Sequence, residues 1–324
     1  MLKIRKANFN EFLTDVMRYN ELVGPTKESK FSKITDINQM EMTRHTTFPA
    51  KKYFFKKKQT LLEFKKQKLT VPEPKHDKKY RIMMGLKRCD LNSIKRQDIM
   101  FTKETKDPYY IEERDRTILI GYHCPEPIDE YCFCGSMELS DFYDLMLYDR
   151  EESYLVEIGS EKGKMFVDKY RKYFWDTEAF ITLMDKKIET NLNLDKKELT
   201  NLYEHKAWKE GIDACLSCGA CTNLCPSCYC FDLYDEVDIK DLQSGKKIRN
   251  WASCQFQSFT KVAGPHIFRE ERADRFKHRI YHQVQWFREK HGMNLCTGCG
   301  RCIRGCPTKI NWVKILNKME VPED

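Results

Sequence analysis

Short apolar runs separated by polar, glycine-containing stretches mark the first half of the chain. Three of them, "RIMMGL" (81–86), "TILIGYH" (117–123) and "YLVEIG" (154–159), consist mainly of residues that favour β-strands. Each run is followed by polar or glycine-containing sequence. The pattern predicts an α/β domain over residues 1–195.

Helical periodicity follows in residues 161–191. This segment carries Phe166, Tyr170, Tyr173 and Phe174 at helical spacing. A helix buries one stripe of its surface, so we assign these aromatic side chains to the core.

A second helical pattern occupies residues 269–292, after a loop-like region. Its apolar stripe consists of Phe276, Ile280, Val284 and Phe287. Gly292 is a suitable helix end because glycine accepts the left-handed conformation there. We therefore expect residues 196–324 to form a mainly α-helical domain.

Cysteines are numerous and clustered. The chain has 15, and six of them fall between positions 215 and 230. The sequence shows no signal-peptide core and no apolar stretch long enough to span a bilayer, so we expect a cytoplasmic protein without membrane association. Because cytosolic thiols are kept reduced, clustered cysteines favour metal ligation over disulfides.

Two runs of cysteines share one spacing. The run Cys-x2-Cys-x2-Cys-x3-Cys-Pro occurs at 215–226 and again at 296–307. This is the bacterial ferredoxin run for a pair of [4Fe–4S] clusters, in which three thiolates wrap one cluster and the fourth ligates the other. Zinc suits paired cysteines but would leave the third and fourth cysteine of each run without a role.

The crossed ligation defines two sets of ligands. Cluster one takes Cys215, Cys218, Cys221 and Cys306. Cluster two takes Cys296, Cys299, Cys302 and Cys225. The iron atoms are thus held through these eight cysteines. Glycines in the runs, such as Gly298 and Gly300, are expected to let the backbone pass close to the inorganic core.

The distance between the two runs bears on the fold. Seventy residues separate Cys225 from Cys296, and the sequence before each run reads as helical. A compact ferredoxin joins its runs by a few tens of residues. By fold-level analogy, we expect the helical ferredoxin arrangement of multisubunit oxidoreductases, with two [4Fe–4S] clusters in this ferredoxin-like domain.

Seven cysteines lie outside these sets. Four thiols near the ends of predicted strands form a possible third [4Fe–4S] site: Cys89, Cys124, Cys132 and Cys134. Their spacing is not a standard run, so zinc binding and a structural role remain alternatives. The last three, Cys228, Cys230 and Cys254, could belong to an alternative site, but buried free cysteine is common, so we interpret them as buried thiols near the clusters.

The net charge and the sequence motifs limit the classes of function that the sequence favours. The formal charge is +8, with a basic run at 51–58, which raises the alternative of a nucleic-acid-binding iron–sulfur protein. No recognition motif accompanies the charge, so a solvated face or a surface for an acidic protein partner is favoured. The sequence contains neither a dinucleotide fingerprint nor a phosphate loop. We expect no catalytic residues and no flavin or nucleotide on this chain.

Several further segments run collinearly along most of the chain and carry a family resemblance. They include "MMGLKRCDLNSIKRQD", "CPEPIDEYCFCGSM", "YLVEIGSEKG", "CPSCYCFDLYD" and "NWASCQFQSFTKVAGPHIFREERADRFKHRI". Together with the second run, they resemble the family that holds sulfhydrogenase β subunits and the dicluster iron–sulfur subunits of anaerobic sulfite reductases.

The resemblance implies an iron–sulfur subunit that transfers single electrons and has no catalytic centre of its own. Its partners would be a flavin subunit that binds NAD(P)H and a catalytic subunit. The catalytic subunit would be a nickel–iron hydrogenase with sulfur reductase activity or, alternatively, an anaerobic sulfite reductase. The early block "KKYFFKKKQ" departs from the family, whose members often have prolines and an acidic residue there.

Overall fold

The computed structural model describes residues 1–66, 68–72 and 79–320. Two compact units divide the chain. Unit 1 comprises Met1–Ala50, Lys78–Leu194 and Cys296–Gly300, and unit 2 comprises Lys51–Asp77, Asp195–Leu295 and Arg301–Asp324. Each unit therefore contains segments that are far apart in the sequence.

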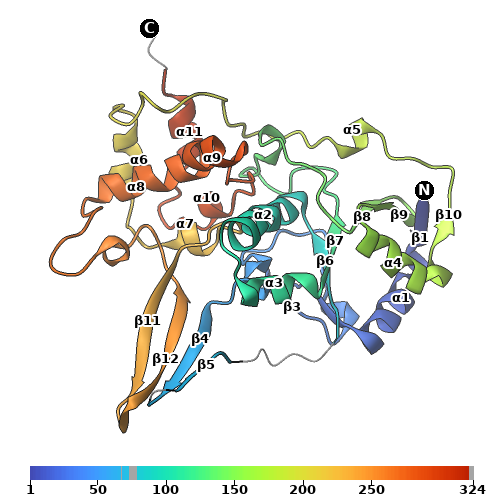
Figure 1. The fold of residues 1–324 in the computed structure, drawn as a ribbon. Coiled ribbons are helices and arrows are strands. Elements are labelled where there is room, and N and C mark those ends of the chain that lie inside the picture. The colour runs from blue at the N-terminus through green and yellow to red at the C-terminus, as the bar shows by residue number, and fades with distance from the viewer. Residues whose placement is uncertain (67, 73–78, 321–324) are drawn as a thin grey trace. The chain divides into compact units, whose positions relative to one another are not determined.

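Unit 1 is built on an eight-stranded mixed sheet (Figure 1). Its strands are β1 (Leu2–Arg5), β2 (Glu21–Pro25), β3 (Phe31–Lys33), β6 (Arg81–Leu86), β7 (Thr117–Tyr122), β8 (Leu145–Asp149), β9 (Ser153–Ile158) and β10 (Trp175–Asp176). The strand order is β10-β1-β9-β8-β7-β6-β2-β3. Neighbouring pairs among β2, β6, β7 and β8 are parallel, and the other pairs are antiparallel. The predicted α/β fold and the three predicted strands are confirmed.

Unit 1 also contains α-helices. They are α1 (Lys6–Tyr19), α2 (Arg88–Asp98), α3 (Pro108–Asp115), α4 (Glu161–Lys169) and α5 (Leu183–Lys186). Alternate residues of the central strands, such as Ile82 and Ile120, join one core with side chains of α1 and α4. The intervening residues Met83, Leu119 and Met146 are also buried. The central strands are thus buried on both faces, as in parallel sheets generally.

The helix predicted over 161–191 is shorter than its pattern suggested. Its regular part, α4, ends at Lys169. Trp175–Asp176 instead forms β10, which pairs with β1 at the edge of the sheet. The chain therefore forms a paired edge strand at Trp175–Asp176 instead of continuing the predicted helix. The four aromatic residues are buried as predicted: Phe166, Tyr170, Tyr173 and Phe174.

Unit 2 combines short helices with a four-stranded antiparallel sheet (Figure 1). Its helices are α6 (Trp208–Ala214), α7 (Ala220–Asn223), α8 (Arg272–Tyr281), α9 (Phe287–His291), α10 (Arg301–Arg304) and α11 (Trp312–Asn317). A π-helical turn, His282–Trp286, joins α8 to α9. The helix predicted near 269–292 is confirmed, and it ends at Gly292, whose φ is +70°. Its whole predicted stripe is buried: Phe276, Ile280, Val284 and Phe287.

The sheet of unit 2 was not predicted. Its order is β11-β12-β4-β5, with β4 (Lys58–Lys65), β5 (Lys68–Thr70), β11 (Phe231–Asp238) and β12 (Asp241–Trp251). The interpretation of the segment after the first cysteine run as a loop is wrong for residues 231–251. Exposed charged residues along β11 conceal its strand pattern.

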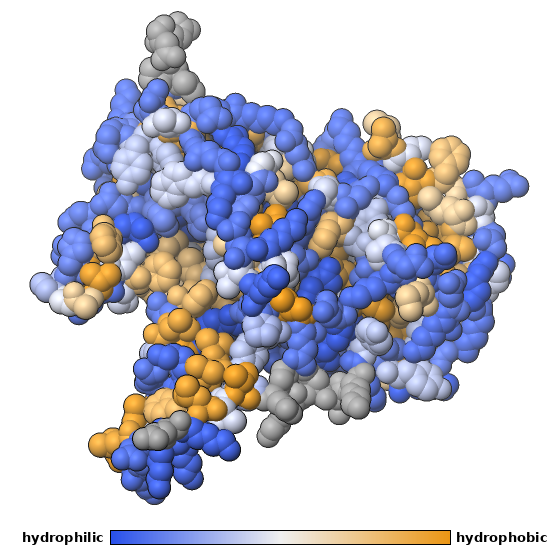
Figure 2. All heavy atoms as spheres, viewed as in Figure 1, coloured by the Kyte–Doolittle hydropathy of each residue, from blue (hydrophilic) through white to orange (hydrophobic). Residues whose placement is uncertain are grey.

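Apolar side chains are also exposed on this sheet. Figure 2 shows apolar atoms gathered over it, and the exposed side chains include Leu69, Leu233, Val237, Ile239 and Leu242. None of the helices in the described part of the chain is long and apolar enough to cross a bilayer.

Candidate metal centres

The sulfur of the first cysteine in each run accepts a hydrogen bond from a backbone amide of the same run. In unit 2, the amide of Ser217 donates to the Cys215 sulfur over 3.4 Å. In unit 1, the amide of Gly298 donates to the Cys296 sulfur, also over 3.4 Å. Amide hydrogen bonds to sulfur favour a thiolate over a thiol. The repeated spacing thus corresponds to a repeated local structure.

The fourth cysteine of each run also has a matching neighbour. The Cys225 sulfur lies 3.3 Å from the hydroxyl oxygen of Ser227. The Cys306 sulfur lies 3.4 Å from the hydroxyl oxygen of Thr308. Each hydroxyl comes two residues after its cysteine, on the far side of the proline. Both runs therefore end with a hydroxyl group beside the sulfur of the fourth cysteine.

Cys221, in α7, lies near several other cysteine sulfurs of unit 2. Burial raises the pKa of Cys221 to about 12. The positive charge of Arg279 opposes this rise. The nearby sulfurs of Cys302, Cys215 and Cys228 add to it. The structure therefore places Cys221 near Cys215, as the ligand set of cluster one requires. It also places Cys221 near Cys302, which the sequence assigns to cluster two.

The remaining cysteines of the two runs in unit 2 differ in environment. Cys218 is exposed, whereas Cys302 and Cys306 are half-buried. The indole N–H of Trp312 donates to the Cys302 sulfur over 3.3 Å. Such a donor stabilises negative charge on sulfur, and sequence reasoning missed it because Trp312 belongs to no cysteine motif.

Unit 1 brings the four cysteines of the possible third site to one edge of its sheet. Cys89 follows β6, and Cys124 follows β7. Because β6 and β7 are parallel neighbours, their carboxyl ends lie at the same edge. Burial raises the pKa of Cys134 to about 12, and the nearby sulfurs of Cys124, Cys132 and Cys299 add to the rise.

A buried lysine faces this set of sulfurs. Lys87 is 4% exposed, and its ammonium group donates to the carbonyl oxygen of Met42. Burial lowers its pKa, while Cys124, Asp90 and Cys89 counteract the effect. A buried cation stabilises negatively charged sulfur. Sequence reasoning missed Lys87, although its position directly after a predicted strand and two residues before Cys89 was a usable signal.

The segment Cys296–Gly300 packs against the loop that carries Cys132 and Cys134. The amide of Phe133 donates to the carbonyl oxygen of Gly298 over 2.8 Å. Nearby, the hydroxyls of Ser93 and Thr297 lie 3.0 Å apart. Part of the second run is thus fixed within unit 1 by direct contacts.

The structure gives a reason for glycine at two positions of this segment, and that reason is not the expected approach to a cluster. Gly298 has a φ of +67°, and a Cβ atom there would lie 2.5 Å from the backbone nitrogen of Cys134. Gly300 has a φ of +69°, and its Cβ would lie 2.4 Å from the carbonyl oxygen of Tyr131. The close approach is therefore to protein backbone, and only glycine fits both conformation and space.

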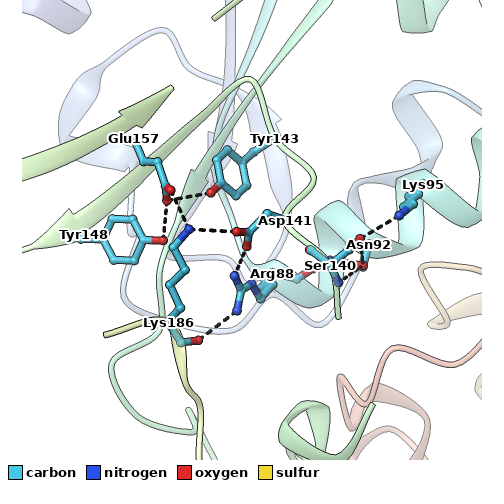
Figure 3. A network of polar contacts seen from close by, with 9 residues as sticks. All are labelled: Arg88, Asn92, Lys95, Ser140, Asp141, Tyr143, Tyr148, Glu157 and Lys186. Carbon is cyan, nitrogen blue, oxygen red and sulfur yellow. Dashed lines mark hydrogen bonds and ion pairs between the residues drawn. The ribbon is translucent and has the colours of Figure 1, made fainter. Parts of the chain in front are cut away.

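A polar network holds the start of α2, which carries Cys89 (Figure 3). Lys186 forms ion pairs with Glu157 at 2.6 Å and Asp141 at 2.8 Å. Arg88 also pairs with Asp141, and it donates to the backbone oxygen of Lys186 over 2.9 Å. The network thus ties the residue directly before Cys89 to two other segments of unit 1.

Two tyrosines complete this network. The hydroxyls of Tyr143 and Tyr148 donate to the Glu157 carboxylate over 2.7 and 2.9 Å. Burial by itself would raise the pKa of Glu157, but Lys186 and the two tyrosines hold it below its usual value. Glu157 therefore stays ionised and keeps the network intact near neutral pH.

The last three cysteines lie together in unit 2. Cys228 lowers the pKa of the Cys230 thiol, whereas Cys254 and burial raise it, to about 12 overall, so the three cysteines are neighbours. Cys228 and Cys254 are buried, and Cys230 is half-buried. Buried thiols near cluster ligands were predicted, but their mutual contact was not.

The donor chemistry suits iron–sulfur clusters. All 15 cysteines are free thiols in the structure. Among the residues described, no group of three or more histidine, cysteine, aspartate or glutamate side chains is placed to hold a single metal ion. An iron–sulfur cluster, which is larger than one ion, takes cysteine thiolates as its ligands. The amide, hydroxyl and indole donors at the sulfurs fit such a group.

Comparisons with known proteins agree with this donor chemistry. A family model described as a 4Fe-4S dicluster domain matches residues 214–310. The chain is 32% identical to sulfhydrogenase 2 subunit beta from Pyrococcus furiosus over 335 aligned positions, which cover 98% of each protein. It is 27% identical to F420-dependent formate dehydrogenase subunit beta from Methanocaldococcus jannaschii over 51% of this chain and 38% of that protein. No solved structure matches the chain.

These findings define the class of the protein and then its family. A chain with a 4Fe-4S dicluster domain and relatives of this kind is an iron–sulfur electron-transfer subunit of an oxidoreductase complex. More specifically, the chain belongs to the family of sulfhydrogenase β subunits.

Proposed function

We propose that this chain relays single electrons between a flavin subunit that binds NAD(P)H and a catalytic subunit of the nickel–iron hydrogenase or sulfur reductase type. The observation that supports this most strongly is the pair of matched cysteine runs in a member of the sulfhydrogenase β-subunit family. Each [4Fe–4S] cluster supplies reversible one-electron transfer when it is bound.

The ligands of the relay follow the crossed pattern. One cluster is held by Cys215, Cys218, Cys221 and Cys306, and the other by Cys296, Cys299, Cys302 and Cys225. The chain's own groups stabilise the thiolates through the amides of Ser217 and Gly298 and the indole of Trp312. Four of the eight cysteines are buried, which limits their contact with water: Cys215, Cys225, Cys296 and Cys299.

A third [4Fe–4S] cluster in unit 1 extends the relay. Its ligands are Cys89, Cys124, Cys132 and Cys134. Two observations support it: Cys134 neighbours both Cys124 and Cys132, and the buried Lys87 faces Cys124 and Cys89. Cys299, which we propose as a ligand of cluster two, is also a neighbour of Cys134, and this supports transfer between the two sets.

Anaerobic purification of the native complex tests the proposed partners. Metal analysis and an optical spectrum identify what co-purifies with the chain. Nickel together with a flavoprotein and a hydrogenase-sized subunit is the expected result. A sirohaem spectrum without nickel would contradict the hydrogenase assignment and make the chain a relay of a sulfite reductase. A chain purified without iron would contradict the relay itself.

A further inference from the structure

The four-stranded sheet of unit 2 has two chemically different faces. Residues directly opposite each other on neighbouring strands point to the same face, and successive residues alternate between faces. The register of β11, β12, β4 and β5 therefore defines one face, here called the apolar face, with six apolar side chains: Leu62, Phe64, Leu69, Phe231, Leu233 and Val237. The other face carries ion pairs, such as Lys246 with Glu63 at 3.1 Å.

The apolar face is covered at its base, where β11 begins and β12 ends. The ring of Phe55 lies 6.3 Å from that of Phe231 and 5.9 Å from that of Trp251. Further along, a Cβ at Gly245 would lie 2.5 Å from the ring of Phe64, so this ring rests directly on β12. These contacts agree with the face that the register assigns to each residue.

Beyond its base the apolar face is open to solvent. Leu69 is 68% exposed and Leu233 is 54% exposed, and Val237 is exposed as well. Ile239 and Leu242, at the turn that follows β11, are also exposed, and Figure 2 shows these apolar atoms gathered on the sheet. An antiparallel sheet usually packs one of its faces against a core. A contiguous exposed apolar surface on a water-soluble domain marks an interaction site.

Charge is separated across this sheet. Residues 231–242, which form β11 and its turn, contain five acidic residues and one lysine, although the whole chain carries a net charge of +8. The opposite edge, around the turn between β4 and β5, is basic and carries Lys65, Lys66 and Lys68. An anionic lipid surface would be repelled by the acidic edge. A protein surface can match both edges, and this match fixes the direction in which it binds.

We propose that the apolar face is the docking surface for one partner subunit of the oxidoreductase complex. That subunit presents apolar side chains at the centre of its interface, basic groups beside β11 and acidic groups beside β5. The chain's relatives are subunits of oxidoreductase complexes, and the interfaces of permanent complexes are more apolar than the remaining surface. The identity of the partner, though not the surface itself, rests on the proposed function.

The base of the sheet is hydrogen-bonded to the segment of the first cysteine run. The amide of Ala252, directly after β12, donates to the carbonyl oxygen of Cys230 over 3.0 Å. The hydroxyl of Thr222, the residue after Cys221, donates to the hydroxyl oxygen of Ser253 over 2.7 Å. A partner on the apolar face thus binds an element that is bonded directly to the segment of the proposed cluster ligands.

Serine at two exposed positions of β11 tests the surface. The full chain with Leu233→Ser and Val237→Ser is expected to bind the other subunits of the native complex at least tenfold more weakly, because it loses two apolar contacts. Sedimentation of the anaerobically purified complex at decreasing concentrations measures this dissociation constant. Tyr234→Ser is the matched control, because Tyr234 is exposed on the opposite face of the same strand. Its dissociation constant should equal that of the wild type.

The wild-type complex gives a second test that does not depend on a variant. Backbone amides of residues 231–242 should exchange with deuterium at least fivefold more slowly in the complex than in the free chain. Equal affinity of the double variant and the wild type, or equal exchange in the free and bound chain, would overturn the proposal. Cross-links from β11 to a second copy of this chain, or binding of β11 to vesicles of anionic phospholipid, would overturn it as well.

Iron content separates this proposal from the relay. The double variant should keep the iron and the electron paramagnetic resonance signals of the wild-type chain, because its substitutions lie outside all cysteine sets. Unchanged affinity together with intact cluster signals overturns only the docking surface. A wild-type chain without iron that still binds through β11 contradicts only the relay, so failures of the two proposals are distinguishable.

Discussion

The two units gather their sulfurs by different means. In unit 2, Cys215 and Cys221 lie within one short run, and local contacts such as the Ser217 amide fix the sulfur positions. In unit 1, Cys89 and Cys124 are 35 positions apart in the sequence, and the parallel strands β6 and β7 bring them to one edge. A sulfur site can thus be encoded either by residue spacing or by sheet topology.

Both units nevertheless place a buried lysine beside sulfur. Lys87 faces Cys124 and Cys89 in unit 1, and Lys51 faces Cys228 in unit 2. Because a buried ammonium group is unfavourable without an anion, the same requirement for negative charge holds in both units. If the two kinds of sulfur site are equivalent in chemistry, matched changes in the two units should have matched effects.

Loss of one thiolate should remove a cluster from either unit. Cys221→Ser in unit 2 and Cys134→Ser in unit 1 are each expected to lower iron by about four atoms per chain, because each removes one ligand of a cubane cluster. Iron and acid-labile sulfide assays of the anaerobically purified chain measure the loss. Cys124→Ser should repeat the result of Cys134→Ser. Unchanged iron in both unit 1 variants would show that those thiols are structural.

Alanine at one positive-φ glycine of each run should have unequal effects. Gly298 and Gly219 both have positive φ values, at +67° and +74°. A Cβ at Gly298 meets the backbone of Cys134, whereas one at Gly219 meets the ring of Phe256, which is a side chain and can move. We expect Gly298→Ala to cost about 3 kcal/mol or more and Gly219→Ala about 1–2 kcal/mol.

Thermal unfolding of the two glycine variants measures this difference. A cost of about 3 kcal/mol corresponds to a Tm lower by about 6–12 °C for a unit of this size. Equal shifts for Gly298→Ala and Gly219→Ala would show that backbone conformation alone, and not the approach to Cys134, sets the cost.

The 4Fe-4S dicluster domain could be predicted from the spacing of the two cysteine runs, since that signal lies in local sequence. The same holds for the strands at 81–86 and 117–123, whose apolar runs are continuous because the parallel sheet is buried on both faces. Lys87, two residues before Cys89, left a usable signal in the sequence, but Arg279 and Trp312 could not be predicted as neighbours of sulfur from their spacing alone. Their proximity arises from long-range packing, which no cysteine motif encodes.

The sheet of unit 2 was missed for a related reason. Every residue of β11, Phe231–Asp238, is exposed, so even its apolar positions are not buried against a core. Its charges pair across the sheet instead, as in the ion pair between Lys247 and Asp235 at 2.7 Å. Backbone pairing between distant segments therefore determines this structure more than burial does.

Removal of the buried cation in unit 1 should make its cluster harder to reduce. In Lys87→Met, we expect the reduction potential of that cluster to fall by about 100 mV, the one-electron equivalent of about 2 kcal/mol of lost charge stabilisation. A redox titration followed by electron paramagnetic resonance measures the shift. Lys95→Met in the same helix is the control, because Lys95 bonds to the hydroxyl of Ser140 and not to sulfur. Equal shifts in both variants would contradict a specific role for Lys87.

The network around Lys186 should make the stability of unit 1 sensitive to acid. The pKa of Glu157 is lowered in the folded chain, so its contribution is present above the ordinary value of 4.5 and is lost as the pH falls through the lower folded value. Lys186→Met is expected to cost about 1–2 kcal/mol at neutral pH and to flatten this acid dependence. Tm values measured from pH 7 to pH 3 test the prediction. The same slope in variant and wild type would contradict it.

The smallest expected effect concerns one hydrogen bond in unit 2. Trp312→Phe removes the N–H that donates to the Cys302 sulfur and keeps an aromatic ring. The potential of the cluster bound by Cys302 is expected to fall by about 20–60 mV, the one-electron equivalent of about 0.5–1.5 kcal/mol. Trp286→Phe is the control, since Trp286 is 39% exposed and lies on another helix segment. An unchanged potential in Trp312→Phe would show that this bond does not tune the cluster.

Passage of electrons through this chain is the central claim, and rapid freeze-quench spectroscopy of the native complex tests it most directly. After NAD(P)H is mixed with the wild-type complex, signals of reduced clusters on this chain should appear before product forms. In an assembled complex that carries Cys221→Ser, the flavin should still be reduced while product formation falls at least tenfold. An assembled Cys221→Ser complex that turns over at the wild-type rate would contradict the account.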